Sequence, residues 1–112
     1  MKTEVTQEDN RTLVTVTGTL DTLTAPELAK ILVDQIAEGH INLIVDLIGV
    51  EFMSSAGLRT LLGAVKESRS NGGDLRIAST NPGVDRVLKI TGFNNIARVF
   101  SSQAEAVLSF SS

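Results

Sequence analysis

Cysteine is absent from all 112 residues of the sequence, so disulfide bonds, thiolate metal sites and cysteine nucleophiles are excluded. Long apolar runs are absent as well, because no segment approaches the ~20 apolar residues that cross a bilayer. The first residues, Met1-Lys2-Thr3-Glu4, lack the apolar segment of a signal peptide. These absences predict a cytoplasmic protein that makes no contact with a membrane.

Positive charge and histidine are also scarce. The 10 Lys and Arg residues are outnumbered by 13 Asp and Glu residues, which gives a net charge of -3. No Lys/Arg cluster with interleaved aromatic residues occurs, so we expect no direct contact with nucleic acid. The single histidine, His40, precedes the predicted central strand and is expected at the opposite end from Ser55, too far away to act as the base of a serine hydrolase.

Two further patterns of catalysis and cofactor binding are missing. The run Ser54-Ser55-Ala56-Gly57 lacks the Gly-x-Ser-x-Gly elbow of serine hydrolases. Neither Gly72-Gly73 nor Asn81-Pro82-Gly83 matches the P-loop or the dinucleotide-binding pattern. We therefore expect no catalytic residue and no cofactor.

The composition is that of an ordinary globular protein, with 42% hydrophobic and 21% charged residues. The length predicts a single domain over residues 1–112. Alternating and apolar runs predict strands over residues 4–7, 12–17, 41–47, 74–78 and 96–100, and amphipathic stripes predict helices that begin near residues 24, 55, 81 and 102.

This order of elements, β-β-α-β-α-β-α-β-α, predicts an α/β fold. Alternating strands and helices imply right-handed crossovers and a mixed, mostly parallel sheet of about five strands with about four helices. The first strand is expected to lie antiparallel at one side. Function in such sheets gathers where strands end and helices begin, and we expect the segment 48–55 to be a loop of this kind.

Helix starts are marked by capping residues. Thr24 and Glu27 are spaced as a capping box, as are Ser102 and Glu105. Asn81 precedes a proline at the first position of its helix.

The most informative stretch joins the predicted strand 41–47 to the helix that follows it. Ser54 and Ser55 stand where this helix begins, and Leu58 starts its apolar stripe. A serine there can cap free backbone N–H groups. The same position also suits a phosphate, because those N–H groups and the positive end of the helix dipole point toward it. The two interpretations, a helix cap alone or an anion site, both remain open at this point.

Asp21 and Asp46 form the one pair of carboxylates that the predicted strand ends bring to a common edge. Such a pair could bind a metal or act as acid and base. No third ligand stands out, and either residue could instead bond backbone N–H groups of its own loop. We expect no metal site.

The helix after Ser55 has two more features of interest. Arg59, Lys66 and Arg69 on its exposed face could meet an acidic ligand or partner, or form a solvated charged surface. Gly63 lies within the helix, where glycine costs about 1 kcal/mol relative to alanine, which indicates the close approach of another group, internal or external.

Three motifs resemble those of the STAS domains, and within them of the bacterial anti-sigma factor antagonists. They are Gly18-Thr19-Leu20-Asp21 with Thr24-Ala25, then Ile44-Val45-Asp46-Leu47, and above all Phe52-Met53-Ser54-Ser55-Ala56-Gly57-Leu58. The family pattern of the last motif is Phe-Met-Asp-Ser-(Ser, Thr or Ala)-Gly-Leu, in which the serine is phosphorylated. That serine corresponds to Ser55, and the family's aspartate is replaced by Ser54.

The resemblance implies a partner-switching regulator and not an enzyme. The unphosphorylated domain would bind an anti-sigma factor that is itself a serine kinase, and phosphorylation of Ser55 with ATP and Mg²⁺ would end the complex. A PP2C-like phosphatase would reset the system. The phosphosite loop and partner surface implied in this way comprise Ser54, Ala56, Gly57, Leu58, Arg59, Asp21 and Asp46.

An alternative from the same fold is a domain that is not phosphorylated. It would bind a nucleotide or another anion at the Ser55 helix terminus, or serve as a scaffold in a signalling or transport assembly.

Overall fold

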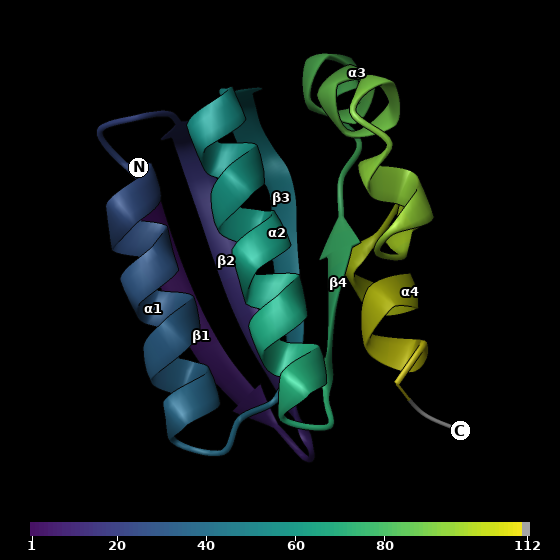
Figure 1. Ribbon diagram of the computed structural model, residues 1–112. Helices are drawn as coiled ribbons and strands as arrows, with labels where there is room; N and C mark the ends of the chain where they lie inside the picture. Colours follow the sequence, from purple (N-terminus) through teal and green to yellow (C-terminus); the bar gives the residue numbers. More distant parts are fainter. Residues whose placement is uncertain (111–112) are drawn as a thin grey trace.

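A five-stranded sheet forms the centre of the structure, a computed structural model that describes residues 1–110 (Figure 1). Residues 111 and 112, which the predicted domain includes, lie outside the described range. The elements in chain order are β1 (Lys2–Glu8), β2 (Arg11–Leu20), α1 (Ala25–Ala37), β3 (Asn42–Met53), α2 (Ser55–Ser70), β4 (Asp74–Ala78), α3 (Pro82–Ile90), the 3-10 turn η1 (Phe93–Asn95), β5 (Val99–Phe100) and α4 (Gln103–Leu108).

The strands follow one another across the sheet in the order β1-β2-β3-β4-β5. β1 pairs with β2 in the antiparallel sense, and the other neighbours are parallel. The predicted α/β class, the order of elements and the mixed sheet are therefore confirmed. None of the helices within residues 1–110 is long and apolar enough to span a bilayer.

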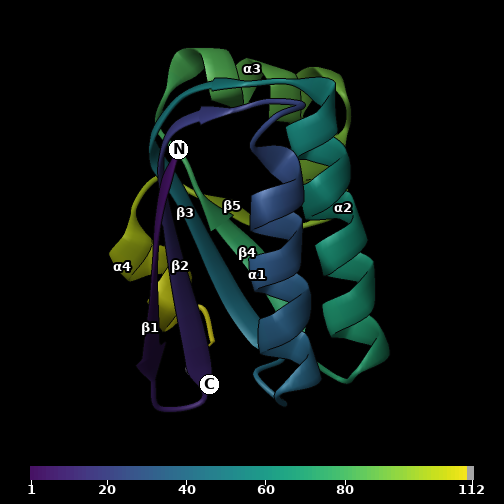
Figure 2. The ribbon, with the colours of Figure 1, turned by 90° about the vertical axis from the view of Figure 1, so that its left-hand side faces the viewer.

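Helices cover the two faces of the sheet unequally. α1 and α2 lie side by side on one face, and α4 lies on the other (Figure 2). The larger core fills the space under α1 and α2, with fully buried side chains such as Leu28, Leu43 and Leu61. The smaller core, around Ile44 and Ala106, lies under α4. α3 lies at the end of the sheet where α1 and α2 begin.

The central strand is longer than predicted. β3 continues from Asn42 to Met53, so most of the predicted loop 48–55 is strand. The reason is that β2 provides a partner along this whole length, up to the pairs between Thr19 and Phe52 and between Leu20 and Met53. Register shifts in this part of the ladder break the regular alternation of side chains. The sequence therefore predicted that the strand ends at residue 47.

The last strand is shorter than predicted. β5 contains only Val99–Phe100, because the chain first forms the turn Phe93–Asn95, in which Phe93 is buried. The apolar run at 96–100 is thus divided between the end of a turn that packs into the core and a two-residue strand.

The predicted caps divide into two groups. Asn81 accepts hydrogen bonds from the N–H groups of Gly83 and Val84, and Ser102 accepts one from Glu105, as expected. The Glu105 carboxylate, however, accepts from the Ser101 hydroxyl, so the box at Ser102 is only half formed. The box at Thr24 is wrong, and the N-terminus of α1 is built differently, as described below.

Two glycines in α2 have opposite surroundings. Gly57 is buried, and a Cβ atom there would lie 2.7 Å from Cγ of Leu20 and 3.1 Å from Cγ of Met53. Gly63 is exposed, and a Cβ atom there would meet nothing within 4 Å. The first glycine is required by packing inside the molecule, whereas the second is not.

We predict that Gly57→Ala and Gly63→Ala change stability in opposite directions. Gly57→Ala should lower the free energy of unfolding by about 1–3 kcal/mol, because the core must move to accept the methyl group. Gly63→Ala should raise it by up to about 1 kcal/mol, because only the helix propensity changes. Urea denaturation at low micromolar concentration measures both values, and equal effects of the two substitutions would contradict this interpretation of the packing.

Candidate functional site at the start of the central helix

The end of β3 and the start of α2 form a tight joint. The N–H of Ser54 donates to the carbonyl oxygen of Leu20 at 2.9 Å, and the Ser54 carbonyl accepts the first helical bond, from Leu58 at 3.1 Å. Ser54 is the N-cap residue, with an extended backbone, and Ser55 is the first residue of the helix. α2 therefore begins where the sequence predicted, at the edge of the sheet where β2 and β3 both end.

The two serines differ in accessibility. Ser55 is exposed. The hydroxyl oxygen of Ser54 is buried, makes no capping hydrogen bond, and finds no partner among residues 1–110. The first turn of α2 contains no acidic residue. The free N–H groups of this turn are thus satisfied neither by Ser54 nor by a nearby carboxylate, and the positive end of the helix dipole is not neutralised locally.

Asp21 organises the neighbouring turn between β2 and α1. Its Oδ1 accepts from the N–H groups of Leu23 at 2.9 Å and Thr24 at 3.1 Å. The Thr24 hydroxyl donates to the carbonyl oxygen of Thr19 and accepts from the N–H of Asp21. Thr24 is the N-cap, but its backbone is αR and not extended, so its side chain cannot reach the next turn as a capping box requires.

These hydrogen bonds also set the charge of Asp21. The N–H of Thr24, followed by that of Leu23, lowers the pKa of Asp21 below its usual value of 3.8. The carboxylate therefore stays ionised to a lower pH than that of an ordinary aspartate.

Asp46 does not lie at a strand end, and this prediction of its position was wrong. It is in the middle of β3 because the strand continues to Met53, and only 6% of it is exposed. Its Oδ1 accepts from the N–H of Ile48 at 2.9 Å, and its Oδ2 accepts from the Gln103 side chain at 2.7 Å. Asp46 thus fastens α4 to the sheet.

Two exposed apolar side chains, neither of which is among the partner-surface residues predicted above, lie at the same end of the sheet. Leu23, in the turn that Asp21 organises, is 88% exposed, and Phe52, two residues before Ser54, is 55% exposed. Both side chains offer apolar area that another protein could contact at this end of the sheet. The sequence held a signal for the exposure of each residue. Leu23 precedes the first helix outside its apolar stripe. Phe52 is the neighbour of Met53 in the chain, and successive side chains of a strand point to opposite faces.

The cationic residues of α2 are divided between exposed positions near the two ends of the helix. Arg59 lies one turn after Ser55, whereas Arg69 near the other end pairs with Asp74 at 2.9 Å. Of these cations, Arg59 is the one that shares the end of the helix with Ser55.

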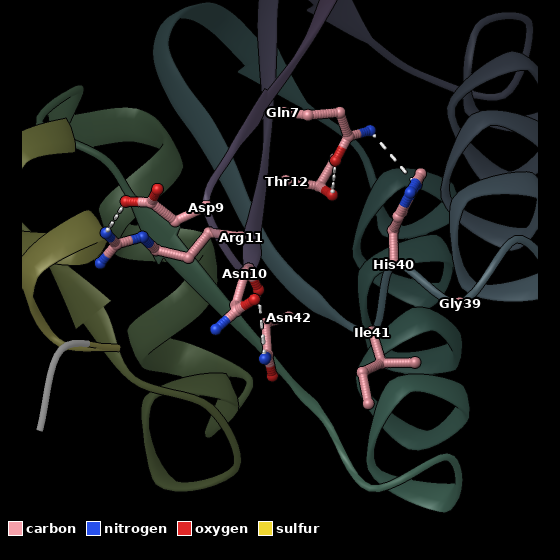
Figure 3. A pocket seen from close by; sticks show the side chains of 9 residues that line it. All are labelled: Gln7, Asp9, Asn10, Arg11, Thr12, Gly39, His40, Ile41 and Asn42. Carbon is pink, nitrogen blue, oxygen red and sulfur yellow. Dashed lines mark hydrogen bonds and ion pairs between the residues drawn. The ribbon is translucent and has the colours of Figure 1, made fainter.

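His40 lies at the other end of β3 from Ser55, as predicted. It borders a polar cleft of about 350 Å³, in which the Gln7 side chain lies between Thr12 and His40 (Figure 3). The Nδ1 atom of His40 is 2.8 Å from Oε1 of Gln35 and 3.2 Å from Nε2 of Gln7. The entire strand β3 separates this imidazole from Ser55, so it cannot activate that hydroxyl.

The sequence and the fold together identify the family. Residues 2–106 match the STAS domain, and the chain belongs to this family.

Several proteins similar to this chain are named anti-sigma factor antagonists. The chain is 32% identical over 96 residues to a Staphylococcus aureus protein named anti-sigma-B factor antagonist, covering 86% of this chain and 89% of that one. It is also similar to the crystal structure of an anti-sigma factor antagonist from Mycobacterium paratuberculosis, with a TM-score of 0.90 at 26% identity, over 96% of this chain and 92% of the other.

A more distant neighbour supports the fold alone. The cell fate determinant SpoIIAA of Bacillus, solved in its phosphorylated form, aligns with a TM-score of 0.75 at 18% identity over 95% of this chain and 96% of its own.

We predict that the two N-cap side chains Ser54 and Asn81 contribute unequally to stability. Ser54→Ala should change the free energy of unfolding by less than about 0.5 kcal/mol, because no capping bond is lost and an unpaired buried hydroxyl is removed. Asn81→Ala should cost about 1 kcal/mol, because two N–H groups lose their acceptor. Urea denaturation compares the two variants, and a loss at Ser54→Ala as large as at Asn81→Ala would show that Ser54 does cap the helix.

Proposed function

We propose that this protein is an anti-sigma factor antagonist that works by partner switching, with Ser55 as the phosphorylated residue. In its unphosphorylated form it binds an anti-sigma factor that is also a serine kinase. The Ser55 hydroxyl then loses its proton to a base of the kinase and attacks the γ-phosphorus of Mg²⁺-bound ATP, ADP leaves, and the complex dissociates. A PP2C-like phosphatase hydrolyses the phosphoserine and restores binding. The names of the relatives support the partner class.

The observation that carries this proposal is the difference between the two adjacent serines. The Ser54 hydroxyl is buried and therefore closed to a kinase, whereas Ser55 is exposed at the first position of α2. Ser54 replaces the family's aspartate without creating a competing phosphorylation site. Gly57 and Leu58 support the loop from below, since both are buried against the core.

The helix N-terminus favours a phosphate at Ser55 instead of resisting it. Free N–H groups and the dipole of a 16-residue helix stabilise negative charge there, and the first turn holds no carboxylate that would repel it. Phosphorylation should therefore leave the fold intact. The switch must act across the interface with the partner.

The surface around Ser55 fits this form of switching. Leu23 and Phe52 offer apolar contact area, and Asp21 and Arg59 contribute charges of both signs. The interface with the partner is formed around the neutral hydroxyl of Ser55. Phosphorylation would add the volume of a phosphate and nearly two negative charges to that interface. Burying an unpaired charge at an interface is costly, and the partner is released.

The alternative of an unphosphorylated anion-binding domain draws on the same geometry. The uncapped N–H groups of α2 could hold a nucleotide phosphate or another anion without any covalent change. The two functions differ in whether a phosphate becomes bonded to Ser55, which the first experiment below decides.

We predict that incubation with its anti-sigma factor kinase and Mg²⁺-ATP adds one phosphate to this protein, on Ser55. Peptide mass spectrometry should find the phosphate on Ser55 in the wild type and in Ser54→Ala, and no phosphate in Ser55→Ala. Transfer to Ser54, or no transfer while the kinase remains active on another substrate, would rule out the proposal.

We also predict that Ser55→Asp weakens binding to the unmodified partner by a few kcal/mol, which is a rise of about a hundredfold or more in Kd. Its free energy of unfolding should stay within about 0.5 kcal/mol of the wild type. Asn10→Asp is the matched control, because it adds the same charge in the turn at the far end of the sheet and should bind normally. Isothermal titration calorimetry measures both affinities, and an unchanged Kd for Ser55→Asp would disprove the switch.

A further inference from the structure

A groove runs between α1 and α2 on the outer surface of the helical layer, with a volume of about 440 Å³. Its most prominent apolar side chain is Val33 of α1, which is 52% exposed. The residues that line the groove are Ala29, Val33, Arg59, Thr60, Gly63, Ala64 and Glu67. The helices α1 and α2 themselves lie side by side in both views of the molecule (Figures 1 and 2).

Gly63 is the glycine on the α2 side of this groove. It is not required by packing within the molecule, since a Cβ atom there would meet nothing within 4 Å. Glycine weakens a helix, and the absence of a side chain lets another backbone approach closely. The sequence indicated that another group approaches Gly63 closely. Because no atom of residues 1–110 does so, we look for this group in a second molecule.

The charges of the groove are arranged symmetrically about Gly63. Arg59 lies four residues before it and Glu67 four residues after it, about 12 Å apart along the helix axis and thus too far apart to pair with each other. Both side chains are exposed, and neither forms an ion pair within residues 1–110. Opposite charges at equal distances from a midpoint are complementary to a second copy of the same pattern turned by 180°.

We propose that this groove is an interface between two copies of the chain, in which the α2 helices cross in antiparallel orientation at Gly63. The twofold axis then brings Arg59 opposite Glu67 of the second copy, and Glu67 opposite its Arg59. Val33 of each copy contacts the α2 helix of the other. A parallel arrangement would bring like charges together, and an unrelated partner would need to carry the reverse charge pattern, which a second copy supplies by symmetry alone.

This inference does not depend on phosphorylation of Ser55. It predicts a reversible dimer of the full chain, measurable by sedimentation equilibrium from micromolar to millimolar concentrations. Arg59→Glu and Glu67→Arg should each raise the dimer dissociation constant about tenfold or more, because symmetry makes each substitution act at two contacts. The double variant Arg59→Glu/Glu67→Arg should restore the wild-type constant, because each pair is then re-formed with its charges exchanged.

Two further variants test whether the dimer forms through this groove. Arg86→Glu changes the net charge by the same amount as Arg59→Glu does. Arg86 lies on the exposed surface of α3 outside the groove, so this substitution should leave the dimer intact. Gly63→Gln should abolish the dimer by filling the crossing point, while its melting temperature as a monomer does not fall. A wild-type chain that stays monomeric at millimolar concentration overturns the proposal. So does a dimer that survives Gly63→Gln or that the charge exchange fails to restore.

Discussion

The contact between Gly57 and the paired residues Leu20 and Met53 is the constraint on which the site depends. These two residues end neighbouring parallel strands, and they leave no room for a side chain at the third residue of α2. The hydrogen bond from Ser54 to Leu20 holds the same joint through the backbone. Together they determine where α2 starts and how it leaves the sheet, so the exposed residue Ser55 has a defined position before any partner arrives.

This rigidity separates the stability of the domain from its regulation. The N-terminus of α2 is supported by buried apolar contacts and not by a capping side chain, since the Ser54 hydroxyl is buried in the protein without a partner among residues 1–110. The backbone N–H groups in the first turn of α2 are consequently available to an anion or to a phosphate added by another protein. A charge introduced there changes what another protein encounters while the core beneath it stays the same.

The sequence predicted the elements well where their signals were local, and less well where pairing decided the outcome. The start of α2 and the cap at Asn81 follow from side chains and their near neighbours in the chain. The extension of β3 beyond residue 47 depends on β2 as a partner and on register shifts, which do not appear in the pattern of a single segment. Asp46 was misplaced for that reason, because its strand was expected to end well before Met53. Local backbone conformation misled the prediction at Thr24, which has the residue type and spacing of a capping box, yet its backbone is helical and Asp21 bonds the turn instead.

The spatial order of the strands is the same as their order along the chain. No strand has to be inserted between two that have already paired, because each one from β2 onward joins the free edge left by its predecessor. The sheet can therefore grow during synthesis in the order in which the ribosome releases the chain, with one helix-containing connection to close at each parallel step and little opportunity for strands to pair out of turn.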